Sequence, residues 1–165
     1  MFGSFGGLPL HPLMVHAVVI FVMASAVGVI ALAIRPNWRH RYGGLLVLIS
    51  LVSVASTWLA VESGNVLTTV PGLGSTGHAD GGTFLLLLVV PLALLTALMY
   101  ALDRRWMVEV NKHGDLYRVT HARQPMALTV IAFVTILAAV AVIVQTGIVG
   151  HSGAEATWSE VVVPG

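Results

Sequence analysis

The chain has 165 residues, of which 57% are hydrophobic and only 9% are charged, and its mean hydropathy is +0.92. A water-soluble domain of this composition would expose large apolar patches, so the soluble globular class is excluded and lipid must cover most of the surface. The chain contains no cysteine, which excludes disulfides, thiolate ligands and iron–sulfur clusters. Any bound metal or cofactor must therefore be held by histidine, methionine or carboxylate side chains.

Four apolar runs are long enough to cross a hydrocarbon core of about 30 Å, which takes about 20 helical residues. These runs cover residues 11–34, 44–65, 83–102 and 126–150. The sequence therefore predicts an all-α integral membrane protein, in which the helices form an antiparallel four-helix transmembrane bundle. A single membrane domain, residues 1–165, accounts for the whole chain.

The first run begins near His11 and Pro12 and ends at Ile34. Proline fits the first turn of a helix, because the N–H that it lacks has no intrahelical partner there. The preceding segment MFGSFGGLPLHP lacks the basic region of a signal peptide, so we expect the first span to be retained.

The second run carries small side chains at a spacing of three to four residues, the pattern that lets membrane helices approach closely. This stripe consists of Ser50, Ser53, Ser56 or Thr57, Ala60 and Ser63. Its expected role is helix packing.

The segment between the third and fourth runs contains two β-prone stretches, MVEV at 107–110 and LYRV at 116–119, separated by turn residues. This pattern predicts a short cytoplasmic β-hairpin between helices three and four.

Basic residues are confined to two connecting segments, 35–41 and 104–123. They are Arg35, Arg39, Arg41, Arg104, Arg105, Lys112, Arg118 and Arg123. By the positive-inside rule both segments are cytoplasmic, which predicts a multi-pass protein with both termini on the extracytoplasmic side.

This topology divides the seven histidines between the two sides. His40, His113 and His121 belong to the inner side, and His11, His16, His78 and His151 to the outer side. The outer side also holds the acidic residues Glu62, Asp80, Glu155 and Glu160. Since no Lys or Arg lies there, cations should be attracted to this face.

A polar layer is expected near the outer ends of the helices. His16 lies roughly 7 Å below the start of the first span at 1.5 Å per residue, and Glu62 and Gln145 lie within a turn or two of the ends of theirs. Ionisable groups at this depth usually face the bundle interior, which makes the layer a site hypothesis. The alternative is structural: His11 could cap its helix, and His16 could hydrogen-bond Glu62.

Two kinds of chemistry suit these side chains. A b-type haem needs two imidazoles on opposite faces of a flat apolar slot between helices, and His16 with His78 or His151 could supply them. A copper or zinc site needs three or four converging ligands, and the candidates for it are His11, His16, His78 and His151, helped by Asp80 or Glu155. His11 and His16 are five residues apart, about 140° around a helix, so both can reach one ion only if His11 leaves the helical path.

Three segments carry a resemblance to a known family: LHPLMVH, then ESGNVLTT with GHADGG, then GHSGAEATW. With them the chain resembles the bacterial four-span membrane proteins grouped as domain of unknown function 2231, over nearly its whole length. Carried over by position, the resemblance points to His11, Pro12, His16, Ser63, Gly64, His78, Gly150, Gly153, Ala154 and Trp158. The chain departs from the family pattern at Asn65 and His151, and the second departure favours His16 with His78 as ligands.

The resemblance implies a bacterial inner-membrane location and a redox setting, because related domains occur beside iron–sulfur and other electron-transfer modules. The leading hypothesis is a small membrane protein that binds b-type haem near its outer face and transfers electrons in or beside a respiratory complex. The alternatives are a non-catalytic accessory subunit of a larger membrane complex and an extracytoplasmic copper or zinc binder. Expected partners are the lipid bilayer and other membrane subunits, not nucleic acid, and no catalytic residue is assigned because the chain is not expected to be an enzyme by itself.

Overall fold

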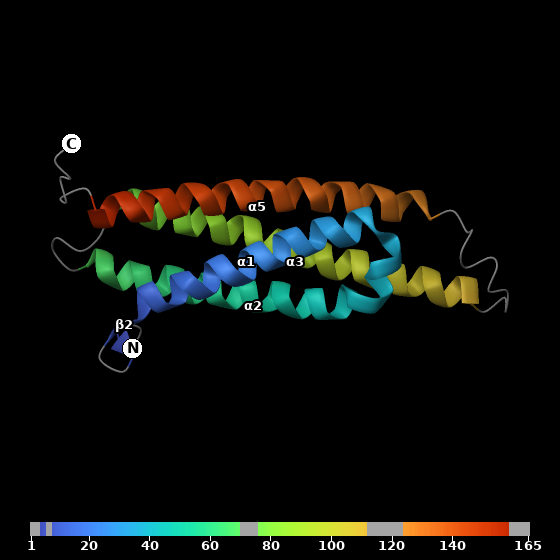
Figure 1. The fold of residues 1–165 in the computed structure, drawn as a ribbon, viewed down its shortest axis with the longest axis horizontal. Coiled ribbons are helices and arrows are strands. Elements are labelled where there is room, and N and C mark those ends of the chain that lie inside the picture. Colours follow the sequence, from blue (N-terminus) through green and yellow to red (C-terminus); the bar gives the residue numbers. More distant parts are fainter. Residues whose placement is uncertain (1–3, 6–7, 70–75, 112–123, 159–165) are drawn as a thin grey trace.

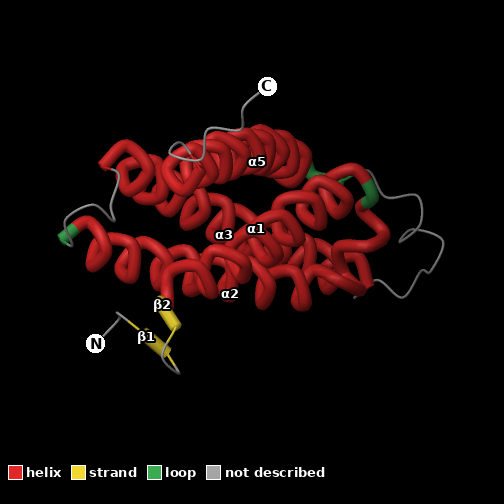
Figure 2. The backbone as a smooth tube through the Cα atoms, turned by 60° about the vertical axis from the view of Figure 1, so that its left-hand side comes forward, coloured by secondary structure: helices red, strands yellow, loops and turns green. Residues whose placement is uncertain are grey.

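The computed structural model describes residues 4–5, 8–69, 76–111 and 124–158. Two strands of two residues, β1 (Ser4–Phe5) and β2 (Leu8–Pro9), pair antiparallel and lie beside the end of the bundle where the first helix begins (Figure 2). The helices are α1 (Leu10–Ile34), α2 (Pro36–Thr68), α3 (Thr76–Asn111) and α5 (Met126–Trp158).

All four helices are long and apolar enough to cross a membrane, with peak mean hydropathies between 2.2 and 2.9. The prediction of an all-helical bundle with four spans is therefore confirmed. Consecutive helices run in opposite directions, so the start of α1 and the end of α5 lie at the same end (Figure 1). Around the bundle the neighbours are α1–α2, α2–α3, α3–α5 and α5–α1.

The helices extend beyond the predicted apolar runs. Only Arg35 separates α1 from α2, and α3 continues through 107–110, the stretch predicted to be the first strand of the cytoplasmic hairpin. That part of the hairpin prediction is wrong, because each residue added to an existing helix gains a backbone hydrogen bond and Met and Glu are good helix formers. The second predicted strand, at 116–119, lies outside the described residues.

The small-residue stripe of α2 is buried inside the bundle. Ser53 is 1% exposed, and the hydroxyl groups of Ser25 on α1 and Ser50 on α2 lie 2.7 Å apart, within hydrogen-bonding distance. The stripe therefore packs α2 against its neighbours within the chain, as expected of small residues in membrane helices.

Arg39 connects neighbouring helices at the end of the bundle opposite to the start of α1. It is 2% exposed, and its Nε and Nη2 atoms donate to the carbonyl oxygens of Leu32 (2.8 Å) and Ala33 (2.7 Å). These are carbonyls of the last turn of α1, which have no acceptor role inside that helix. Nη1 donates to Oε1 of Gln124 (3.2 Å), which ties the start of α5 to the same point.

Asp103 on α3 supplies a negative charge near Arg39. Its side chain is 2% exposed, and its Oδ2 atom has no hydrogen-bond partner among the described residues. Arg39 was expected in a solvated connecting segment, but it is a buried part of α2.

Candidate functional site

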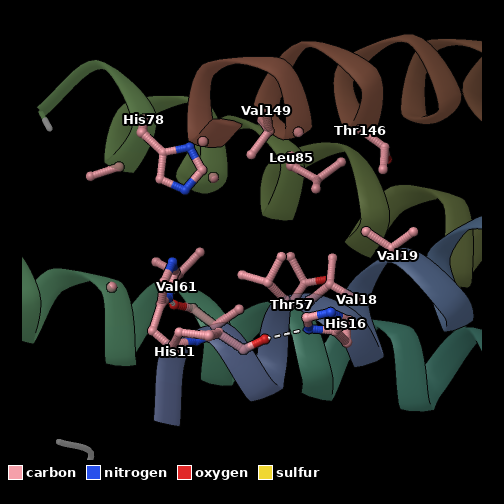
Figure 3. A pocket seen from close by; sticks show the side chains of 18 of the residues that line it. His11, His16, Val18, Val19, Thr57, Val61, His78, Leu85, Thr146 and Val149 are labelled. Carbon is pink, nitrogen blue, oxygen red and sulfur yellow. Dashed lines mark hydrogen bonds between the residues drawn. The ribbon is translucent and has the colours of Figure 1, made fainter. Parts of the chain in front are cut away.

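A cavity of about 680 Å³ lies between the α1–α2 pair and the α3–α5 pair, at the end of the bundle where α1 begins (Figure 3). This volume is within the usual range of about 300–1,000 Å³ for small-molecule sites. The lining is mostly apolar, with three histidines and a few threonines. It includes His11, Val15, His16, Val18, Val19, Thr57, Ala60, Val61, Gly64, Leu67, His78, Gly82, Leu85, Thr146, Val149, Gly150 and Gly153.

His11, in the first turn of α1, is half-buried against α2. Its Nδ1 lies 2.9 Å from the carbonyl oxygen of Ala60, which can only accept a hydrogen bond, so Nδ1 carries the proton. Ser63 Oγ, which donates to the same carbonyl, lies 3.5 Å from Nδ1. The hydrogen bond therefore engages Nδ1 and leaves Nε2 as the ring nitrogen that can face a ligand.

His78, in the first turn of α3, is held in the same way by α5. Its Nδ1 lies 3.1 Å from Oγ of Ser152, and that hydroxyl donates its own hydrogen to the carbonyl oxygen of Val149 (3.0 Å). Since Ser152 can then only accept, His78 donates from Nδ1, and its Nε2 is likewise the ring nitrogen that can face a ligand. The ring extends from α3 toward the α1–α2 layer (Figure 3).

Two glycines make room for these rings. A Cβ atom at Gly64 would lie 3.0 Å from Cε1 of His11, and one at Gly153 would lie 2.9 Å from Cε1 of His78. Both distances are shorter than ordinary van der Waals contact, so each imidazole rests directly on the neighbouring helix backbone.

The rings of His11 and His78 come from opposite helix layers and meet at the cavity. Their centroids are 5.9 Å apart, and their planes are nearly perpendicular, at 85°. His11 and His78, which are more than sixty positions apart in the chain, are thus brought together, and both donate from Nδ1. The sequence singled out both histidines but paired His78 with His16 instead.

His16 lines the cavity but is exposed, one turn further along α1. Its Nδ1 donates to the carbonyl oxygen of Pro12 in its own helix (2.7 Å), so Nε2 is the ring nitrogen that this bond leaves available (Figure 3). Glu62, its expected alternative partner, is half-buried and is not part of the cavity lining.

The remaining predicted site residues lie outside the cavity. His151 is exposed and faces Glu155 on the same helix (3.3 Å), and Asp80 is also exposed. Gln145 is buried and donates from Nε2 to the carbonyl oxygen of Gly81 (3.1 Å), which ties α5 to α3. In the described part of the chain, no three His, Asp or Glu side chains lie close enough to hold a metal ion.

Sequence reasoning missed Ser152 and the backbone acceptor at Ala60. A serine next to Gly153 carries no recognisable signal by itself, and a carbonyl acceptor is invisible until the helices are docked. Ser152 and Gly153 are adjacent, so the Ser152 hydroxyl lies beside the His78 ring that packs against the glycine. This arrangement becomes visible only once His78 is known to pack there.

The motifs that resembled a known family are supported by comparison of the whole chain. No curated protein and no solved structure matches it. One family model does match, over residues 7–163, and that range contains all four helices and the cavity. The chain therefore belongs to the family described as predicted membrane protein (DUF2231).

Proposed function

We propose that this protein binds one b-type haem in the cavity, with His11 and His78 as the two axial ligands, and that it transfers single electrons. The observation that carries the proposal is the pair of imidazoles that approach from opposite layers, each with Nδ1 engaged by the neighbouring helix and Nε2 left as the nitrogen that can bind a metal. Ligating histidines are usually held in this way, by a second-shell partner on the other ring nitrogen. Haem iron supplies the electron-transfer chemistry, and the protein supplies the ligands and their orientation.

The spacing of the rings supports a shared metal atom. With metal–nitrogen bonds of about 2.0–2.1 Å on each side, two axial imidazoles have centroids roughly 6 Å apart, and the observed separation is 5.9 Å. The cavity extends between the two layers beside these rings and has apolar walls such as Val18, Leu85 and Val149. A flat apolar macrocycle suits a slot between two helix layers.

His11 is a better partner for His78 than His16 is. His11 is held against α2 by the Ala60 carbonyl, whereas His16 is exposed and bonded only to its own helix. The pairing of His16 with His78 from the family pattern is thereby replaced in this proposal by His11 with His78.

The two-ligand arrangement favours haem over copper or zinc. Those ions take three or four protein ligands, whereas axial coordination of haem takes two because the porphyrin supplies the others. The accessory-subunit alternative receives no support from α2, because its small-residue stripe is already buried within the bundle.

The proposed site lies near the extracytoplasmic face of a bacterial inner membrane. The basic residues that the structure describes lie at the other end of the bundle, and the positive-inside rule assigns that end to the cytoplasm. A haem at this position could exchange electrons with a respiratory complex in the same membrane.

The test is an optical spectrum, a pyridine haemochrome assay and iron analysis of protein purified in detergent from haem-supplied cells. We expect one haem b per chain, and loss of the ferrous α-band in His11→Ala and in His78→Ala. His151→Ala is the matched control, because that side chain is exposed and outside the cavity, and it should keep full haem content. Absence of both a Soret band and iron in the wild-type protein would end the proposal.

A further inference from the structure

The cavity opens sideways between α1 and α5. The exposed residues of its lining lie mainly on these two helices: Pro12, His16 and Val19 on α1, and Gly150 and Ala154 on α5. In contrast, the lining residues of α3 are buried or half-buried. The interface between α1 and α5 is also the least extensive of the four between neighbouring helices.

This mouth lies in the lipid-facing surface. His16 is six residues into α1, roughly 9 Å along the helix from its first residue. The side chains beside the mouth are apolar and exposed, including Val19 (46%) and Ile20 (63%) on α1 and Ile148 (56%) on α5. A lipid-soluble molecule in the bilayer could therefore reach the cavity along this apolar side of the mouth.

His16 is the ionisable side chain at this mouth. Because its Nδ1–H is bonded to the Pro12 carbonyl, Nε2 is the ring nitrogen that can exchange a proton with a ligand. The proposed haem ligands do not include His16, so its basic nitrogen has no role in holding the iron.

We infer that a lipid-soluble quinol binds at the mouth between α1 and α5 and reduces the haem, with His16 as the base that accepts the hydroxyl proton. This inference rests on the proposed function, because the oxidised haem is the electron acceptor. A quinol combines an apolar ring and tail, suited to the mouth, with a hydroxyl group suited to Nε2.

The reaction balances with one quinol and two oxidised haem equivalents. Each of the two quinol O–H bonds would break, and Nε2 of His16 would accept each proton and release it to water at the end of the bundle. The bound haem would accept the two electrons one at a time, so that one quinol and two oxidised haems would give one quinone, two protons and two reduced haems. Since one chain holds one haem, the two electrons go to two protein molecules or to one molecule that is reoxidised between transfers.

The experiment mixes oxidised, haem-loaded protein anaerobically with a short-tailed benzoquinol and follows the rise of the ferrous α-band. We expect His16→Ala to bind haem normally and to be reduced by dithionite as fast as wild type. Its reduction by the quinol should be slower, by on the order of 100-fold for loss of a general base. His151→Ala should be reduced by the quinol at the wild-type rate.

A second pair of variants tests the route. A Cβ atom at Gly150 or at Gly147 meets nothing within 4 Å, so both positions accept a side chain without strain, but only Gly150 lines the cavity. Gly150→Leu should slow reduction by the quinol at least tenfold, whereas Gly147→Leu should not change it.

The outcomes separate this inference from the proposed function. A wild-type protein without haem refutes the proposed function. Haem that dithionite reduces but the quinol does not refutes the quinol inference alone, as does loss of haem in His16→Ala, which would make His16 a ligand. Equal quinol rates in Gly150→Leu and Gly147→Leu would show that the quinol does not act through the mouth between α1 and α5, and would refute this inference.

Discussion

Glycine at positions 64 and 153 determines how closely two histidine rings can lie against neighbouring helix backbones. In Gly153→Ala the new methyl group would lie 2.9 Å from Cε1 of His78, and in Gly64→Ala 3.0 Å from Cε1 of His11. Either ring must then shift, and ligand geometry tolerates errors of only about 0.5 Å. We expect both variants to lose most of their haem, as measured by the haemochrome assay.

Gly147→Ala is the matched control for both substitutions. It adds the same methyl group to α5, where nothing lies within 4 Å, and it replaces a poor helix former with a good one. Haem content should remain at the wild-type level. Equal haem content in all three variants would show that the close contacts with the rings are not needed for ligation.

At the level of single residues, the sequence predicted which histidines gather at one end of the bundle. Charge segregation placed His11, His16 and His78 at one end of the bundle, and all three line the cavity. It could not show that His151 points away from the cavity, since that depends on the rotation of α5. Nor could it show which imidazoles meet, because partners such as the Ala60 carbonyl arise only from helix docking.

Arg39 joins the last turn of α1, the start of α5 and the negative charge of Asp103 at a buried point. Arg39→Met leaves buried carbonyl oxygens of α1 without their donors, and each unsatisfied buried polar group typically costs about 1–3 kcal/mol. It also removes a nearby positive charge from the buried carboxyl group of Asp103. We expect a clearly lower unfolding temperature in detergent. The haem spectrum should be unchanged, because Asp103 lies roughly 37 Å along α3 from His78 at 1.5 Å per residue.

Two further variants test this account of Arg39. Arg41→Met also removes a guanidinium from α2, but Arg41 is exposed, and its guanidinium lies over the ring of its neighbour Tyr42 (5.4 Å), so the unfolding temperature should barely change. In Arg39→Met/Asp103→Leu the unpaired carboxylate is absent, and part of the lost stability should return. An Arg39→Met protein as stable as Arg41→Met would contradict the capping role.

A second prediction at the level of a helix concerns the small-residue stripe of α2. Ser53 is 1% exposed inside the bundle, so Ser53→Leu forces extra carbon atoms between packed helices, which usually costs about 1–3 kcal/mol. Ala55→Leu is the matched control, because Ala55 is exposed on the same helix. Thermal unfolding should show a loss of stability in Ser53→Leu only. An equal effect of both substitutions would mean that the stripe is not a packing surface.

The number and order of the helices were predictable because apolar length alone identifies a membrane span. The helix ends were not, since helices continue past the hydrocarbon core wherever backbone hydrogen bonds and good helix formers allow it. The residues at 36–43 and 103–111 therefore read as connecting segments but belong to α2 and α3. For the same reason Arg39 and Asp103 were not expected to be buried together.

At the scale of the whole molecule, the basic side chains and the histidine-lined cavity lie at opposite ends of one bundle. The histidine-lined cavity occupies the end where α1 begins, and the described basic residues, in segments 35–41 and 104–105, lie at the other end. Hydropathy and charge could predict this polarity. The cavity itself could not be predicted, because it depends on how far two pairs of helices stand apart.

The orientation of this bundle decides whether the cavity serves the extracytoplasmic side. Because the chain has no cysteine, single cysteines can be introduced and labelled without background. Glu155→Cys lies at the cavity end, with a 68% exposed side chain, and Asn37→Cys is exposed at the opposite end without removing a basic residue. A membrane-impermeant maleimide should label Glu155→Cys in intact cells and Asn37→Cys only after the membrane is opened. The reverse pattern would place the cavity on the cytoplasmic side, against the positive-inside rule, and would require any electron partner of the haem to be cytoplasmic or within the membrane.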